Sequence, residues 1–127
     1  MATAATTTDE APVARNDVFL TGRLSAEPTT RTLPSGDEIT SWRLVIDRFG
    51  SGGRGAQVPG HRPVTVDTID CVGHRKGIQR AAARWAPGDV IEVRGALRRR
   101  FWRGQQGAAS RYEVEVLQAK RLASRQL

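Results

Sequence analysis

The sequence predicts an all-β fold, a five-stranded barrel with one short helix between its third and fourth strands. Two observations support this prediction. Five segments alternate apolar and polar residues with the period of two that is typical of strands, and one segment repeats apolar residues at the helical spacings of three and four. Turn-forming Gly, Pro and Asp separate the segments. A chain of 127 residues is long enough for one domain that needs neither metal nor disulfide to fold.

The individual elements follow from these patterns in chain order. The expected strands and helix span residues 18–24, 39–48, 64–72, 74–86 (the helix), 90–102 and 110–121. In the second strand Trp42, Leu44 and Ile46 share one face. The motif GQQG at residues 104–107 predicts the turn between the last two strands. Three strands, a helix and two strands is the element order of the OB-fold, a Greek-key barrel.

The predicted organisation is one OB-fold domain at residues 15–122, preceded by a disordered tail at 1–14 and followed by a short tail at 123–127. The first 14 residues are rich in Ala and Thr and show no periodicity, which is typical of disorder. They lack the basic start and apolar block of a secretory signal, and no apolar run in the chain reaches membrane-spanning length. We therefore expect no membrane association and a cytoplasmic, nucleoid-associated location.

The charge balance gives a first indication of the partner. The chain has 20 Lys and Arg against 13 Asp and Glu, a net charge of +7, and Lys76 and Lys120 are its only lysines. A basic domain attracts polyanions such as nucleic acid. The preference for arginine is equally consistent with a GC-rich genome, so charge alone leaves the partner open.

The most informative segment is VIEVRGALRRRFWR at residues 90–103. Strand alternation places four functional side chains on the face opposite Leu97: Arg94, Arg98, Arg100 and Trp102. Residues 94–103, which end with Arg103, contain five arginines and no acidic residue. Cations for the phosphates and a flat ring for a base are what a single strand of nucleic acid requires. The alternative is a solvated basic edge strand whose charges prevent sheet-to-sheet aggregation.

The other aromatic residues are interpreted from their neighbours. Trp42 and Trp85 lie among apolar residues at the right period and are expected in the core. Phe49 ends the second strand beside a glycine-rich loop, where it is either a second stacking site or structural. Phe101 has the opposite parity from the tryptophan that follows it and is expected to be packed, and Phe19 is expected to be structural.

Residues 50–60 form a glycine-rich loop that lacks the Gly-Lys-Ser/Thr sequence of a phosphate-binding loop. Two interpretations remain open. The loop is either a hairpin tip whose Arg54, with Arg48 and Arg62 nearby, contacts a flexible strand, or a plain linker.

No set of residues suited to catalysis or metal binding is evident. Cys71 and His74 are three residues apart, but even with His61 a zinc site needs a further ligand, and no residue is placed to orient a Cys–His nucleophile. Cys71 is therefore expected to be a small buried residue. We expect no cofactor, no metal and no enzymatic activity.

Four motifs resemble those of the bacterial single-stranded DNA-binding protein family: NDVFLTGRL, EPTTRTLPSG, PGDVIEVRGALRRRFW and RYEVEV. They lie within residues 16–121, nearly all of the expected domain. The resemblance implies an OB-fold that forms homotetramers, coats single-stranded DNA with little sequence preference and has no catalytic activity.

The resemblance also implies roles for individual residues. Trp102 matches a base-stacking tryptophan, and Arg98 and Arg100 match its basic neighbours. Arg31 and Lys76 fall where the family places basic residues near the DNA.

Three positions depart from the family pattern. Thr68 and Gly50 stand where the family has tryptophans, and His74 stands at the position of a stacking phenylalanine at the helix entrance. His74 can still stack on a base, and arginine is expected to take a larger share of the binding. The chain ends in the basic segment RLASRQL at residues 121–127 and not in the family's acidic tip, so it is either a shortened form of a longer chain or a tailless paralogue. In the second case, recruitment of replication and repair enzymes through that tip is not expected.

Together these observations predict sequence-independent binding and coating of single-stranded DNA, in replication, recombination or repair. The alternative is an OB-fold interaction module whose basic face docks a protein.

Overall fold

The computed structural model describes residues 11–48 and 65–125. Its elements in chain order are β1 (Val18–Leu24), β2 (Thr29–Thr32), β3 (Glu38–Asp47), β4 (Val66–Gly73), α1 (Lys76–Ala82), β5 (Val90–Gly104) and β6 (Gly107–Ala123). All five predicted strands and the predicted helix are present, and β2 is an addition to them.

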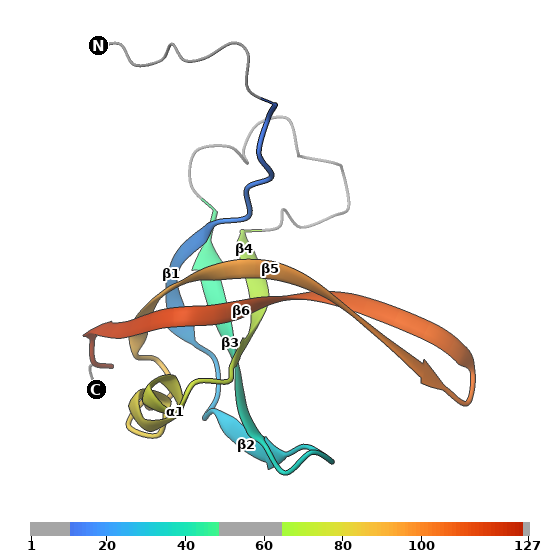
Figure 1. The fold of residues 1–127 in the computed structure, drawn as a ribbon. Helices are drawn as coiled ribbons and strands as arrows, with labels where there is room; N and C mark the ends of the chain where they lie inside the picture. The colour runs from blue at the N-terminus through green and yellow to red at the C-terminus, as the bar shows by residue number, and fades with distance from the viewer. Residues whose placement is uncertain (1–10, 49–64, 126–127) are drawn as a thin grey trace, which may run out of the picture.

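Five of the strands close into a barrel (Figure 1). β1 pairs with β5 along most of its length and with β3 at Arg23 and Leu24, so the ring runs β1-β5-β6-β4-β3 and back to β1. β4 and β6 run parallel, and the other pairings among the described strands are antiparallel. β2 pairs with β3 outside this ring. The predicted OB-fold is confirmed.

Apolar side chains from all five barrel strands fill the interior. The fully buried ones include Leu24, Leu44, Ile91, Val93, Val114 and Val116. Trp42 of β3 and Trp85 meet edge to face, with ring centroids 5.1 Å apart, and α1 adds Ile78 and Ala82 to the same core. This confirms the prediction that both tryptophans are core residues.

β2 and the limits of the helix differ from the sequence prediction. All four residues of β2 are exposed, so no apolar alternation marked it, and only backbone pairing with β3 defines it. The helix was expected at residues 74–86 but ends at Ala82, because the amides of Arg84 and Trp85 bond to carbonyls three residues back in tight turns. No helix in the described part of the chain is long and apolar enough to cross a membrane.

The distal parts of β5 and β6 continue beyond the barrel as a two-stranded hairpin, which we call the arm (residues 98–104 and 107–113). Figure 1 shows it projecting away from the other strands. Gly104 pairs with Gly107 at its tip, as the GQQG motif predicted. The prediction that Phe101 is packed was wrong, since 71% of this residue is exposed. Parity alone failed here because both faces of the hairpin are exposed around Phe101.

Candidate nucleic-acid interface

Cross-strand pairing sorts the side chains of the arm onto two faces. Arg98 lies opposite Glu113, Arg100 opposite Arg111, and Trp102 opposite Ala109. These six residues share one face, which we call the groove face, because directly paired residues of a ladder point the same way. Trp102 is 49% exposed, and the guanidinium of Arg111 lies 6.0 Å from its ring centroid.

The arginines of the groove face have acidic partners on β6. Arg98 Nε donates to Glu115 Oε1 at 2.9 Å, and Arg100 Nη1 donates to Glu113 Oε2 at 3.2 Å. Arg111 Nη2 lies 3.8 Å from the other oxygen of Glu113. Glu113 is buried, so its carboxylate requires this pairing, and it also offsets the repulsion between two arginines that face each other. Residues 94–103 contain no acidic residue, but the arginines of the groove face are paired with carboxylates on the neighbouring strand β6.

Four neighbouring hollows share lining residues and together form one groove. His74 lines the first and second hollows, Arg100 the second and third, and Arg111 the third and fourth. The third hollow has a volume of about 340 Å³ and is lined by Arg31, Arg100, Trp102 and Arg111. Along the groove the ring-bearing side chains are His74, Trp102 and Trp42, and the cationic ones are Lys76, Arg98, Arg100, Arg31, Arg111 and Arg43. The acidic ones are Asp37, Glu38, Glu115, Glu113, Glu27 and Asp70.

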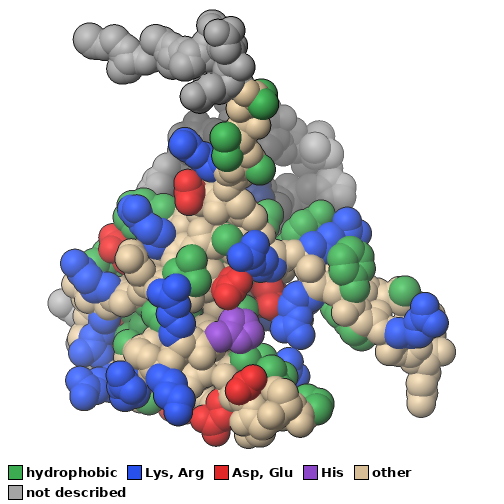
Figure 2. Space-filling model, in the orientation of Figure 1, with side chains coloured by type: hydrophobic (Ala, Val, Ile, Leu, Met, Phe, Trp, Pro, Cys, Tyr) green, Lys and Arg blue, Asp and Glu red, His purple; other side chains and the backbone are tan. Residues whose placement is uncertain are grey.

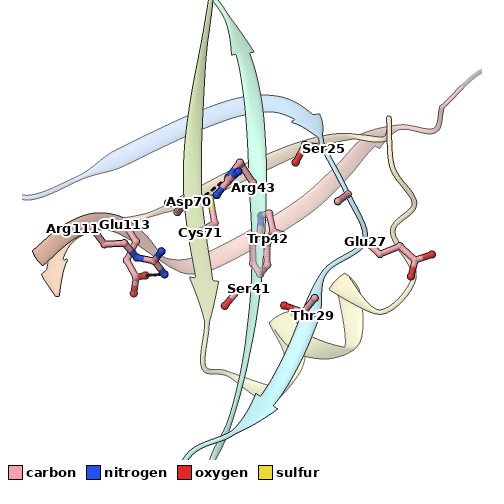
Figure 3. A pocket seen from close by; sticks show the side chains of 11 residues that line it. Ser25, Glu27, Thr29, Ser41, Trp42, Arg43, Asp70, Cys71, Arg111 and Glu113 are labelled. Carbon is pink, nitrogen blue, oxygen red and sulfur yellow. Dashed lines mark hydrogen bonds and ion pairs between the residues drawn. The ribbon is translucent and has the colours of Figure 1, made fainter. Parts of the chain in front are cut away.

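The fourth hollow carries the groove from the arm onto the barrel (Figure 3). Arg111 and Glu113 lie at one side of it in the figure, and Arg43 of β3 is joined to Asp70 of β4 at 2.9 Å. Trp42 forms part of its floor. Figure 2 shows Lys and Arg side chains spread over one face of the barrel and along the arm, where hydrophobic side chains lie between them.

The structure brings together half of the twelve residues that the sequence singled out. Six of them line the groove: Arg31, His74, Lys76, Arg98, Arg100 and Trp102. Phe49, Arg54 and Arg62 lie outside the described residues.

Three predicted arginines lie away from the groove lining. Arg94 shares a strand face with Trp102, but it lies on the barrel, where its guanidinium sits 4.3 Å from the ring centroid of Phe19. Phe19, expected to be structural, is therefore an exposed ring on the outer face of β1. Arg48 is held by two hydrogen bonds to Asp67, which lowers the pKa of that carboxyl. Arg103 points to the opposite face of the arm from Trp102.

Sequence reasoning missed Arg43 on β3 and three residues of the site on β6, Arg111, Glu113 and Glu115. A usable signal was present, because the GQQG turn fixes which residues of the two strands face each other. Counting back from that turn places Arg111 opposite Arg100 and Glu113 opposite Arg98.

Cys71 lines the fourth hollow of the groove. Burial raises the pKa of the Cys71 thiol to about 12, so the reactive thiolate is scarce at neutral pH. Among the described residues, no group of three or more His, Cys, Asp and Glu side chains is arranged to hold a metal ion. What this surface offers a ligand is a series of arginines that alternate with carboxylates, and the exposed ring of Trp102.

Comparisons with known proteins agree with this geometry. A family model described as the single-strand binding protein family matches residues 15–122. The chain is 31% identical over 102 residues to a single-stranded DNA-binding protein of Bacillus cereus, covering 80% of this chain and 55% of that protein. It is 29% identical over 92 residues to single-stranded DNA-binding protein 1 of Staphylococcus aureus, covering 72% of this chain and 51% of that protein. The chain thus spans about half the length of these curated relatives.

A solved structure shares the fold. The Plasmodium falciparum SSB complex with ssDNA superposes with a TM-score of 0.67 at 18% sequence identity, covering 90% of this chain and 98% of that one.

Proposed function

The chain belongs to the single-strand binding protein family, and from this premise we propose that it binds and coats single-stranded DNA without sequence preference. The observation that carries the proposal is the half-exposed indole of Trp102 in a groove lined by arginines. A base can stack on this ring whatever its identity, because every base has a π-face. Arg31, Arg100 and Arg111 surround the same hollow and supply positive charge for the phosphates.

The acidic partners of the groove arginines determine which of these arginines can exchange a carboxylate for a phosphate. The pair between Arg98 and Glu115 is exposed, and such pairs contribute about 0–1 kcal/mol to stability, so a phosphate oxygen can replace the carboxylate at small cost. Glu113 is buried, and removing its arginines would leave an uncompensated charge in a poorly hydrated site. We therefore assign Arg98 to phosphate binding, while Arg100 keeps its bond to Glu113 and presents its remaining N–H groups.

The assembly and cellular role extend this proposal. We propose a homotetramer that acts in replication, recombination or repair without catalysis, with residues 15–122 as the binding domain. A cytoplasmic, nucleoid-associated location follows from this role, since the DNA of a bacterial cell lies there.

The experiment is a titration with oligo-dT. Replacing Trp102 by Ala should weaken binding by about 1–3 kcal/mol, the usual loss for one base stack. Trp102→Phe is the matched control, because it keeps a ring and should retain most of the affinity. Binding should also weaken steeply as salt rises, since each phosphate contact releases counterions. The part of the tryptophan quenching that is lost in Trp102→Phe reports the stacking on Trp102, because Trp42 and Trp85 are present in both proteins.

If the parent chain and Trp102→Ala bind oligo-dT with equal affinity, the assignment of Trp102 as a stacking residue is wrong. A parent chain that does not prefer single-stranded over double-stranded DNA would instead favour a protein-docking module with a basic face.

A further inference from the structure

The side of the arm away from the groove carries its own set of aromatic and basic residues. Pairing places Arg99 opposite Tyr112, Phe101 opposite Ser110, and Arg103 opposite Ala108. We call this set the back face. Two of its side chains are large exposed rings, Phe101 at 71% and Tyr112 at 57%. Both are more exposed than Trp102 on the groove face.

The arginine of the back face lies between the two rings. The guanidinium carbon of Arg99 is 5.0 Å from the ring centroid of Phe101 and 5.3 Å from that of Tyr112. Its N–H groups also donate to Ser110 Oγ at 3.1 and 3.3 Å. These contacts hold Arg99 and the rings in place, and a preorganised surface loses less entropy when it binds.

The back face also differs from the groove face in its charge. On the groove face, carboxylates pair with the arginines, whereas the back face of the arm holds no acidic residue. Among the described residues, neither Arg99 nor Arg103 lies within salt-bridge distance of a carboxylate. The back face therefore carries two arginines with no acidic partner among the described residues, whereas the three arginines of the groove face share Glu113 and Glu115.

This chemistry identifies the occupant as a polyanion with flat rings. A second copy of the chain docking through the same face would pack together two surfaces that each carry Arg99 and Arg103 and no acidic residue, which like-charge repulsion disfavours. A partner with an apolar surface would leave both guanidiniums buried without a counter-charge. A single strand of nucleic acid satisfies both requirements, because its bases stack on rings and its phosphates pair with guanidiniums.

We propose that the back face is a second stacking surface for the same single-stranded DNA, with Phe101 and Tyr112 as the rings and Arg99 and Arg103 as the cations. This inference rests on the proposed function. Phe101 and Trp102 are consecutive residues on opposite faces of a ribbon only two strands wide, so a strand that leaves the groove can pass over the edge of the arm and continue on its back. The arm is then wrapped by DNA rather than touched on one side.

The test compares oligo-dT ligands of increasing length on the full chain and on two variants, Phe101→Leu and the double variant Phe101→Leu/Tyr112→Leu. Leucine keeps apolar bulk but removes the π-face. Short oligomers that fill only the groove should bind all three proteins equally. Longer oligomers should bind the single variant about 5- to 150-fold more weakly than the parent, which corresponds to one lost stack, and the double variant more weakly still.

A fluorescence variant gives a readout independent of affinity. In Trp102→Phe/Phe101→Trp the exposed tryptophan sits on the back face, and its emission should be quenched by long oligomers but not by short ones. Circular dichroism and thermal melting confirm that each variant is folded.

The outcomes separate the two proposals. If the parent chain fails to bind oligo-dT, the proposed function itself is wrong. If Trp102→Ala weakens binding while the leucine variants bind long oligomers like the parent, the groove stands and the second surface is refuted. A lower molar mass of the leucine variants by light scattering would also refute it, because the face would then be a contact between copies of the chain.

Discussion

Glu115 limits how strongly Arg98 can attract a phosphate. The two side chains are joined by one bond of 2.9 Å at the surface. Replacing Glu115 by Gln removes the negative charge and frees the guanidinium. We expect Glu115→Gln to bind single-stranded DNA more tightly at low salt and to show a salt dependence steeper by about 0.7 in log–log slope, the value for one added phosphate contact.

Glu92→Gln is the matched control for this prediction. It changes the net charge of the chain by the same amount, yet among the described residues Glu92 takes part in no salt bridge. If both variants gain the same affinity, the effect is that of overall charge and Arg98 has no special role.

At the scale of elements, the course of β5 and β6 from barrel to arm depends on Gly95. The ladder shifts register between Arg94 and Gly95, where β6 contains one residue more than β5. A Cβ atom on Gly95 would overlap the carbonyl oxygen of Glu115, and backbone cannot move aside as a side chain can. We expect Gly95→Ala to cost about 1–3 kcal/mol of stability, as overpacked sites do.

Thermal melting measures this cost, and Gly104→Ala serves as the control. A Cβ at Gly104 meets nothing within 4 Å, so its melting temperature should stay close to that of the parent. If Gly95→Ala has the same melting temperature as the parent, the backbone at the register shift has room for a Cβ atom and the prediction is wrong.

The strands of the barrel could be predicted because a strand with one buried face shows apolar and polar residues in alternation in the sequence. In β1 and β3, residues such as Leu24, Trp42 and Leu44 alternate with polar ones as a wall with one buried face requires. β2 shows no such alternation because all four of its residues are exposed. Phe101 was misassigned for a related reason, since alternation indicates which residues share a face but not whether anything covers that face.

At the scale of the whole molecule, the site could be predicted only in part from the sequence. In the segment containing Trp102, the arginines and the tryptophan follow one another along a single strand, so the sequence alone predicted their role. The structure places Arg98 and Arg100 in the same groove as Trp102. The contribution of β6 was not visible in that segment, because Glu113 and Arg111 reach the site through pairing across the hairpin. Charge balance in a sheet is a property of neighbouring strands, so reading one strand overestimated the free positive charge.

One buried carboxylate connects distant parts of the chain. Asp89, just before β5, accepts hydrogen bonds from the amides of Ala86 and Arg125 at 2.9 and 2.8 Å, and Arg121 Nη1 lies 3.4 Å from it. It thereby ties the end of β6 to the turn after α1. The two amide bonds, followed by the arginine, lower the pKa of Asp89 in the folded chain.

The sign of the resulting pH dependence follows from this shift. Because the folded pKa lies below the unfolded value of about 3.9, acid protonates the unfolded chain first. The stabilisation is therefore complete at pH values above about 5 and is lost as the pH falls through the folded pKa. Asp89→Asn should lower the free energy of unfolding at neutral pH, and its stability should decline less between about pH 5 and 2 than that of the parent. Asp17→Asn is the control, since this carboxylate is exposed, and its stability should depend on pH as that of the parent does. Parallel profiles for Asp89→Asn and the parent in denaturant titrations would show that other carboxylates govern the acid sensitivity of the fold.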